Sequence, residues 1–364
     1  MFVITLSLIE FCINLIVWGS YGMALLAPYV SPKLWEWPAF FNMMYPLLLV
    51  VTGLSWGYNL LRKNWKSCGI YFLLLLFSVP YIKTYIPYHS NSKLSHEKDI
   101  RVLTFNVMLL QNKKKEKTPP AVQLIRSYNP DIICLQECPY SNNPARDYTK
   151  LHSYFGDNWP YIYPDGKAQH AKGVAIASRY PILYTEDIPY PTQGNGSCLY
   201  ILQLPEGKRL LVVNNHMESY SLTPAEKKSY KTSLKELSLK TIPRLAYQLQ
   251  KRLGPALELR AEAARRVAKR TQEVIQQYNV ENVIVCGDFN DLPMSYTYHT
   301  LKGELSDAYA HCGKGLGVSY NEKYFPFRID HLFYSSSLEA IGVLIPPSKN
   351  CSDHNPLIVD LKYR

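Results

Sequence analysis

Short motifs of carboxylate, amide and imidazole side chains recur from Thr104 to the C-terminus, most of them where an apolar run ends. Carboxylate and amide oxygens are ligands that Mg²⁺ prefers, and a cation beside imidazoles can catalyse reactions at phosphate. These residue types therefore predict metal-assisted phosphate chemistry, provided that the fold brings the motifs together. In chain order they are Thr104-Phe105-Asn106, Leu135-Gln136-Glu137, Asn215-His216, Gly287-Asp288-Phe289-Asn290, Arg328-Ile329-Asp330 and Ser352-Asp353-His354.

Asp288 and Asn290 follow the apolar run 283–286. Side chains two residues apart in an extended chain point to the same side, so a carboxylate and an amide would be delivered together. Gly287 permits a close approach of the backbone at this point. The same residues could equally form an ordinary polar turn after a strand.

Asp353 and His354 are adjacent in a loop before another apolar strand. Neighbouring side chains diverge, so the two residues are expected to do separate work, one on a metal and one on the substrate. His354 then needs another carboxylate to fix its tautomer, and Asp330 is the candidate. The alternative is a hydrogen-bonded surface loop.

Glu137, Asn106 and His216 each close an apolar run. A glutamate in that position is either a cap or a metal ligand. A single histidine at a strand end is more often a packed structural residue than a catalytic one. Only the set of motifs as a whole favours the catalytic interpretation.

The elements that position these motifs alternate between strands and helices. A strand from Ile100, a helix at 119–128 and a strand at 131–137 form a βαβ signature. The segment 222–279 has the periodicity of an amphipathic helix, which Gly254-Pro255 should divide in two. The pattern predicts an α/β sandwich, two sheets face to face with helices outside. Further strands are expected at 173–178, 182–187, 198–204, 209–215, 282–288, 328–334, 339–345 and 356–362.

The first 88 residues have a different composition from the rest. Apolar stretches at about 2–30, 39–61 and 68–88 each approach or exceed the ~20 residues that cross a bilayer core. They predict an anchor of three transmembrane helices rather than a secretory signal peptide, because no basic residue precedes the first stretch. Residues 89–98 read as a linker to the domain at 99–364.

Few charges set the expected orientation of this anchor. Arg62, Lys63 and Lys66 place the loop between the second and third spans in the cytoplasm. The N-terminus would then be cytoplasmic and the domain extracytoplasmic, on a bacterial inner membrane. Lys83 and Lys93 oppose this orientation.

Net charge and cysteine content give weaker signals. The chain carries +11, and the segment 222–272 alone holds 13 Lys and Arg against 4 Asp and Glu. Such a segment could meet anionic lipid or nucleic acid, although most charge runs are simply solvated faces. Cys134 and Cys138 lack partners at zinc-site spacing, so the cysteines are expected to be buried apolar residues, with a disulfide still open.

The order and spacing of the motifs resemble those of the endonuclease/exonuclease/phosphatase superfamily, over residues 99–362. The segment 172–182 (Lys-Gly-Val-Ala-Ile-Ala-Ser-Arg-Tyr-Pro-Ile) resembles an internal strand motif of that superfamily, and 27–32 (Ala-Pro-Tyr-Val-Ser-Pro) resembles its bacterial membrane-attached members. The resemblance implies a four-layered α/β sandwich and a Mg²⁺ cofactor, or Mn²⁺.

The same resemblance implies roles for individual residues. Glu137 would bind the metal, and Asn106 and Asp353 would complete the metal or phosphate site. Asp288 and Asn290 would position the attacking water and hold the phosphate. His216 and His354 would bind the scissile phosphate and transfer protons, with Asp330 orienting His354. His331 departs from the pattern, because an aromatic residue is common at its position.

The sequence thus predicts a membrane-anchored, Mg²⁺-dependent phosphoesterase, most simply a phosphodiesterase, with either Asp288 or His354 as the base. Its substrate could be a lipid head group, a small molecule or a nucleic acid, and no obligate protein partner is expected. One alternative is a nuclease that uses 222–279 as a phosphate rail. Another is a catalytically silent membrane scaffold that binds a partner through that segment.

Overall fold

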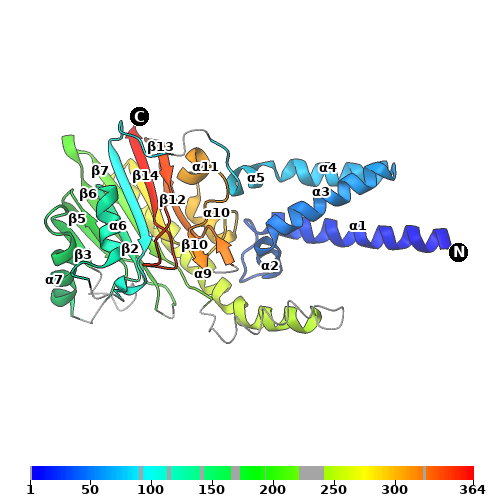
Figure 1. Ribbon diagram of the computed structural model, residues 1–364, viewed down its shortest axis with the longest axis horizontal. Helices are drawn as coiled ribbons and strands as arrows, with labels where there is room; N and C mark the ends of the chain where they lie inside the picture. The colour runs from blue at the N-terminus through cyan, green and yellow to red at the C-terminus, as the bar shows by residue number, and fades with distance from the viewer. Residues whose placement is uncertain are drawn as a thin grey trace.

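The computed structural model describes residues 2–89, 93–112, 116–139, 143–164, 173–192, 194–220, 242–322 and 325–364. Helices occupy the N-terminal part, and the domain that follows is built on two mixed six-stranded sheets with helices around them (Figure 1). The first sheet has the order β13-β14-β1-β2-β4-β3, with bounds Leu338–Leu344, Leu357–Tyr363, Ile100–Asn106, Ile132–Gln136, Ala175–Ser178 and Tyr161–Pro164. The second has the order β5-β6-β7-β8-β12-β9, with bounds Ile182–Asp187, Gly196–Gln203, Arg209–His216, Asn282–Asp288, Asp330–Tyr334 and Ser306–Asp307.

The two sheets pack face to face through one apolar core. Val102, Ile132 and Ile176 of the first sheet and Val212 and Ile284 of the second belong to it, all at most 1% exposed. The predicted α/β sandwich is therefore confirmed. Alternate side chains on each strand point to opposite faces, which leaves the other face of each sheet to be covered by helices.

Helices cover both outer faces and complete four layers. On the first sheet, α6 (Pro120–Tyr128) and α7 (Pro144–Phe155) pack over β1, β2 and β4. On the second, α9 (Ile242–Tyr278) and α10 (Tyr296–Lys302) pack over β6, β7, β8 and β12. Apolar residues buried on both faces explain why these strands read as continuous apolar runs rather than alternating ones.

The predicted βαβ unit is present as β1, α6 and β2, with β1 and β2 parallel. A proline in the first turn suits the start of α6, and Asn129, with a φ of +49°, ends it in the left-handed conformation. The sequence analysis did not predict α7, β3, α10, β9, α11 (Ala308–Cys312), the hairpin of β10 (Tyr320–Glu322) and β11 (Phe325–Phe327), or the short helices η1 (Met108–Leu110) and η2 (Pro205–Gly207).

The long helix α9 contradicts one prediction. Gly254-Pro255 does not divide it, since α9 continues from Ile242 to Tyr278 with Pro255 inside. A proline within a helix costs about 3 kcal/mol. Here the neighbouring Leu253 and Leu257 are buried, which offsets that cost. The part of the predicted basic segment before Ile242 lies outside the described residues.

The N-terminal apolar stretches form five helices: α1 (Phe2–Leu26), α2 (Trp37–Met43), α3 (Tyr45–Leu61), α4 (Trp65–Phe77) and α5 (Val79–Tyr85). By length and apolarity, Ser7–Leu26 can cross a membrane. The pairs α2–α3 and α4–α5 are bent by 78° and 48°, and each pair would have to count as one span to reach three among the described residues. One span is therefore established as a candidate, while the predicted three stay a prediction.

Polar side chains join these helices internally. Asn14 of α1 and Asn59 of α3 exchange side-chain hydrogen bonds of 3.3 and 3.1 Å, and the Tyr71 hydroxyl of α4 donates to Asn14 Oδ1 at 2.7 Å. Apolar side chains on the outside of the same helices are exposed, among them Ile16, Leu54 and Phe77. Polar inside and apolar outside is the arrangement of helices that pack within lipid.

Gly287 provides a test of the strand packing. Its φ is +130°, and a Cβ there would lie 2.0 Å from the Asn215 carbonyl oxygen, on the neighbouring strand β7. Overpacking typically costs about 1–3 kcal/mol. We expect Gly287→Ala to lower the free energy of unfolding by about 1–3 kcal/mol more than Gly194→Ala does. Gly194 is the matched control, because it has a similar φ of +142° and its Cβ would meet nothing within 4 Å. Thermal unfolding of the full chain in detergent measures both, and equal losses would contradict this packing.

Candidate functional site

The register of three neighbouring strands places three site residues in one row. In the β7–β8 pair His216 lies opposite Asp288, and in the β8–β12 pair Asp330 lies opposite Asp288. Each strand meets this edge of the sheet because β7 and β8 are parallel and β12 begins there. The second sheet alone thus delivers an imidazole and two carboxylates to one edge.

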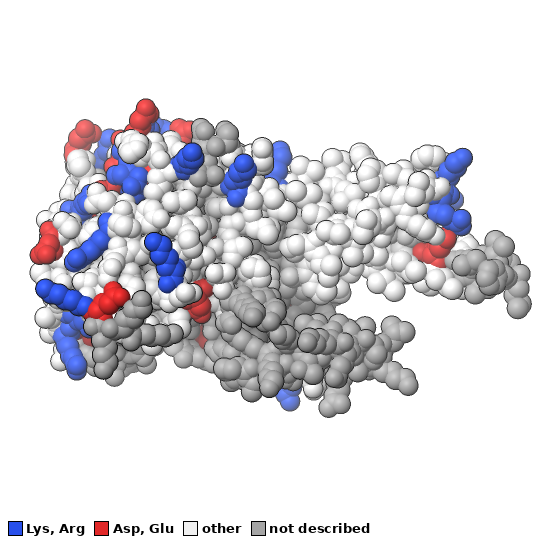
Figure 2. Space-filling model, in the orientation of Figure 1, with Lys and Arg blue, Asp and Glu red and all other residues white. Residues whose placement is uncertain are grey.

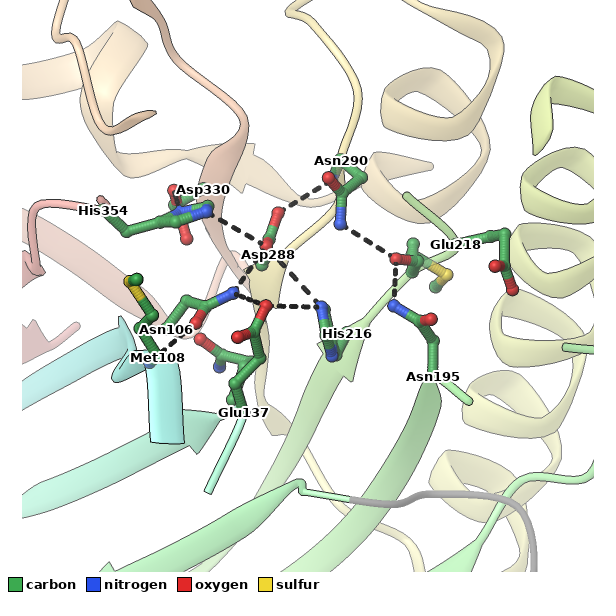
Figure 3. A network of polar contacts seen from close by, with 12 residues as sticks. Asn106, Met108, Glu137, Asn195, His216, Glu218, Asp288, Asn290, Asp330 and His354 are labelled. Atoms are coloured by element: carbon green, nitrogen blue, oxygen red, sulfur yellow. Dashed lines mark hydrogen bonds and ion pairs between the residues drawn. The ribbon is translucent and has the colours of Figure 1, made fainter. Parts of the chain in front are cut away.

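The first sheet supplies Asn106 and Glu137 to the same place (Figure 3). Asn106 ends β1 and is fully buried, and its Nδ2 donates to Glu137 Oε1 and to Asp288 Oδ2, both at 3.0 Å. Its Oδ1 accepts from the Met108 amide at 3.1 Å. In this orientation the amide bridges two carboxylates that belong to different sheets. The Glu137 side chain is 38% exposed, so this carboxylate remains accessible.

His216 lies between the two bridged carboxylates. Its Nε2 is 3.8 Å from Glu137 Oε1 and 3.8 Å from Asp288 Oδ2. Its Nδ1 is buried without a hydrogen-bond partner among the described residues. Burial lowers the pKa of His216, although Asp288 opposes that shift. The ring therefore favours the neutral form, which can accept a proton or a hydrogen bond.

His354 has the opposite electrostatics. Its Nδ1 is 2.9 Å from Asp330 Oδ2, and its Nε2 is 3.6 Å from Asp288 Oδ2. Burial by itself disfavours the charged ring, but Asp330 and Asp288 outweigh it and raise the pKa of His354 to about 10. The site therefore pairs a neutral imidazole with an imidazolium at neutral pH.

Asp288 sits at the centre of these contacts. It is buried, its Oδ1 accepts from the Asn290 amide at 2.9 Å, and its Oδ2 faces Asn106 and both histidines. Burial raises its pKa, while the two histidines pull it down. Asn290, with a φ of +50°, turns its Nδ2 to the Met217 carbonyl at 2.9 Å.

Asp353 stands apart from this group. Its carbonyl accepts from the Asn321 amide at 2.8 Å, and its carboxylate helps to raise the pKa of His354. No hydrogen bond within the described residues joins its side chain to the other site residues. The groups that could together hold a metal ion are Asp288, Asp330 and His354, whose ligand atoms lie within 4.8 Å of one another. The metal roles predicted for Glu137, Asn106 and Asp353 stay predictions.

Several residues support the site without having been singled out in the sequence. Asn195 Nδ2 donates to the Met217 carbonyl at 2.7 Å, so it shares that acceptor with Asn290. Glu218, which follows Met217, is buried. Its carboxylate accepts from the Thr192 hydroxyl, and its backbone carbonyl accepts from Arg260 at 2.9 Å. In Figure 3 its side chain points away from Asp288.

A buried amide bridge ties the two sheets together beneath the site. Gln136 Nε2 donates to Asn214 Oδ1 at 2.6 Å and to the Thr104 hydroxyl at 3.0 Å. Asn214 Nδ2 in turn donates to the carbonyls of Leu135 and Ala175. Each of these amides is adjacent in sequence to the site residues Glu137 or Asn215-His216. Adjacency to a candidate is the signal that could have identified them.

His331 and the cysteines have structural environments. His331 packs against Phe289, Tyr298 and Phe333, and burial lowers its pKa to about 4, so it takes the place of an aromatic residue.

All eight cysteines lie within the described residues and none forms a disulfide. The open possibility of a disulfide is therefore not realised.

The fold and the site define a two-sheet α/β sandwich with a cluster of acidic, amide and imidazole groups at one edge. A family model described as Endonuclease/Exonuclease/phosphatase family matches residues 103–354. The chain belongs to this family, which consists of phosphoester hydrolases. A second model, for a domain of unknown function, matches residues 6–85. A search of curated proteins found no match.

Solved structures with similar folds come from several sources. The human Nocturnin catalytic domain with bound sulfate is 19% identical, with a TM-score of 0.49, over 73% of this chain and 94% of that one. A family protein from Bacteroides thetaiotaomicron is 20% identical, with a TM-score of 0.49, over 73% and 98%. A mannosyl-6-phosphatase from the same species is 19% identical, with a TM-score of 0.48, over 72% and 100%.

The Asp330–His354 contact predicts a specific pH response. A histidine whose pKa rises on folding stabilises the protein fully below about pH 6.5 and loses that contribution as the pH rises to about 10. We expect Asp330→Asn to lower the pKa of His354 and to flatten this loss, as followed by ring-nitrogen NMR and unfolding. Asp353→Asn is the control, since its carboxylate contributes less than that of Asp330. An unchanged His354 pKa in Asp330→Asn would contradict the assignment.

Proposed function

We propose that the protein is a membrane-anchored, Mg²⁺-dependent phosphoesterase that acts first of all on phosphodiesters. The observation that carries the proposal is the environment of Asp288. A single buried carboxylate faces two imidazoles of opposite protonation tendency and an amide that bridges to Glu137. Such a group has no structural need for so many polar neighbours, whereas in-line hydrolysis at phosphorus needs all of them.

Asp288 and Asn290 handle the attacking water. The Asp288 carboxylate accepts the proton of a water that approaches phosphorus. Asn290 holds the loop after β8 in place beside this water, through its bonds to Asp288 and to the Met217 carbonyl. The water oxygen forms the new P–O bond while the bond to the leaving oxygen breaks. Positioned groups of this kind contribute roughly 10²–10⁴-fold to the rate.

The two histidines contact the phosphate from the other side. His354, held by Asp330, donates from Nε2 to a phosphate oxygen or to the departing oxygen. His216 stays neutral and binds the phosphate through Nε2, the ring nitrogen that faces Glu137 and Asp288. Asp330 thus acts through His354 as a positioning residue, since it orients the ring and keeps it charged.

The donor set suits a hard divalent cation. Glu137 offers an accessible carboxylate, and Asp288 offers a second one, since Asn106 Nδ2 donates to both of them. Mn²⁺ would fit the same donors. When bound, the cation polarises a phosphoryl oxygen and stabilises charge on the leaving group. The chain itself supplies the proton transfers and the orientation of the phosphate.

The apolar helices anchor the enzyme. We propose that α1 crosses the bilayer, that the bent pairs α2–α3 and α4–α5 accompany it, and that the basic end at Arg62, Lys63 and Lys66 is cytoplasmic. The catalytic domain then lies on the extracytoplasmic face. The internal polar contacts of these helices and their apolar exterior support this arrangement.

The two alternatives are less well supported. A nuclease rail needs free basic side chains, but Arg265 and Arg266 both pair with Glu262. Arg270 likewise pairs with Glu186. This part of α9 is therefore a paired, solvated face. A silent scaffold has no use for the buried polar contacts around Asp288.

Activity and metal dependence can be tested together. We expect the full chain in detergent to hydrolyse bis(p-nitrophenyl) phosphate with Mg²⁺, to stop with EDTA and to recover on addition of Mg²⁺. Asp288→Asn should lose roughly 10²-fold or more. Glu137→Gln should need more Mg²⁺ for half-maximal activity, while Glu97→Gln, at an exposed and distant position, serves as the control. Turnover that is indifferent to EDTA and to Asp288→Asn would refute the proposal.

Anchoring and orientation need a separate test. We expect the chain to stay in the membrane pellet after alkaline carbonate extraction, because its apolar helices are embedded. An alkaline phosphatase fused after Arg364 should be active, and a green fluorescent protein fused at the same place should be dark. Release by carbonate would refute the anchor, and the reverse reporter pattern would refute the proposed side.

A further inference from the structure

The anchor helices pack directly against the loops that carry the catalytic residues. Leu292 lies four residues after Asp288, and Ile329 precedes Asp330. Both are buried in one apolar cluster with Tyr21 of α1, Tyr45 of α3 and Tyr81 and Tyr85 of α5. Figure 1 shows the same docking, with α5 and α2 against the side of the sandwich that carries α10, α11 and β10. The anchor is thus not a flexible tether.

Polar contacts extend this docking to three loops of the site. Asn42 Nδ2 of α2 donates to the Met294 carbonyl at 3.5 Å, in the loop after β8. The Tyr220 hydroxyl, in the segment after His216, lies 3.6 Å from Met43 Sδ. The Arg328 guanidinium, before β12, donates to the Thr84 carbonyl of α5. The loops after β7, after β8 and before β12 therefore all touch the anchor.

The surface of the anchor fixes the height of these loops relative to a bilayer. Figure 2 shows a band almost free of charge between a charged cluster at the far end of the anchor and the charged surface of the sandwich. On the anchor, Arg62 forms an ion pair with Glu10. At the sandwich end of this band, the Tyr29 ring contacts that of His299 on α10 and is still 64% exposed. Leu34 and Trp35, in the same loop between α1 and α2, are 86% and 48% exposed. Aromatic residues of this kind mark the boundary between hydrocarbon and water. The docked loops lie next to that boundary.

We propose that the substrate is a lipid of the same bilayer that carries a phosphate ester, reached by the site at the membrane surface; this rests on the proposed function. Tyr and Trp at a membrane surface sit at the level of the head groups, so the phosphate of such a lipid would lie near Tyr29 and Trp35. Extracting a lipid into water costs about 0.8 kcal/mol per CH₂ group. A site docked onto its own anchor avoids that cost, because the acyl chains stay in the bilayer while the head group reaches Asp288.

The docking also argues against a soluble substrate as the natural one. A phosphate ester dissolved in water could be hydrolysed by a domain on a long flexible linker, in any orientation. Burying Leu292 and Ile329 against membrane helices instead fixes one orientation of the site toward the bilayer plane. Confinement of enzyme and substrate to the same surface raises their effective concentration for one another.

The test compares substrate in the same membrane with substrate in another one. In the first sample, the full chain is reconstituted with Mg²⁺ into substrate vesicles made of bacterial polar lipid, sphingomyelin and phosphoinositide. In the second sample, the full chain is reconstituted with Mg²⁺ into phosphate-free galactolipid vesicles, and these are mixed with substrate vesicles that contain no protein. Mass spectrometry follows loss of each lipid, and bis(p-nitrophenyl) phosphate reports soluble turnover in both samples. We expect a lipid phosphoester to be lost roughly 10²-fold faster in the same membrane, with equal soluble turnover.

The outcomes separate the two proposals. Soluble turnover with no lipid loss would overturn the lipid substrate, and equal lipid loss in both samples would overturn the claim that the lipid is taken from the same bilayer. Either result leaves the phosphoesterase intact. Absence of all turnover would overturn both.

A second measurement uses variants of the anchor. Trp35→Ser should lower the ratio of lipid to soluble turnover at least about tenfold, because it weakens the contact of the protein with the membrane interface. Tyr161→Ser, a similarly exposed aromatic on β3, should leave that ratio unchanged, and equal ratios in both variants would count against the proposal.

Discussion

The register of β7, β8 and β12 is the constraint on which the site depends. It sets His216, Asp288 and Asp330 side by side, and the lack of a side chain at Gly287 lets the Asn215 backbone of β7 lie against it. A slip of one residue would send each side chain to the opposite face of the sheet. The amide of Asn106 then connects this row to Glu137 on the other sheet, so the site forms only when both sheets are packed.

Burial gives the same groups their reactivity. Burying two carboxylates and two imidazoles in one site costs free energy unless each group has a partner. The two histidines differ in how strongly the carboxylates contact them. His354 has Asp330 and Asp288 as neighbours and favours the charged ring, whereas burial dominates at His216 and favours the neutral ring. One fold thereby provides an acid and an acceptor within reach of the same carboxylate. The family assignment supplies the reaction class for which such a pair is useful.

Sequence reasoning located most strand ends and their polar residues because apolar runs and the residues that close them are local signals. Asn106, Glu137, His216, Asp288, Asp330 and His354 do converge. Periodicity could not reveal the Gln136–Asn214 bridge, since pairing across sheets depends on tertiary packing. The proline rule failed at Pro255, where burial of its neighbours outweighs the lost hydrogen bond. Docking of the anchor onto Leu292 and Ile329 also left no local pattern.

The central claim is that these strand ends form one metal–phosphate site. Anomalous scattering from crystals of the full chain grown with Mn²⁺ tests it most directly. The account predicts an anomalous peak within coordination distance of a Glu137 carboxylate oxygen, beside Asn106 and Asp288, and loss of that peak in Glu137→Gln. A peak elsewhere in the molecule, or a peak that persists in Glu137→Gln at full height, would contradict the account.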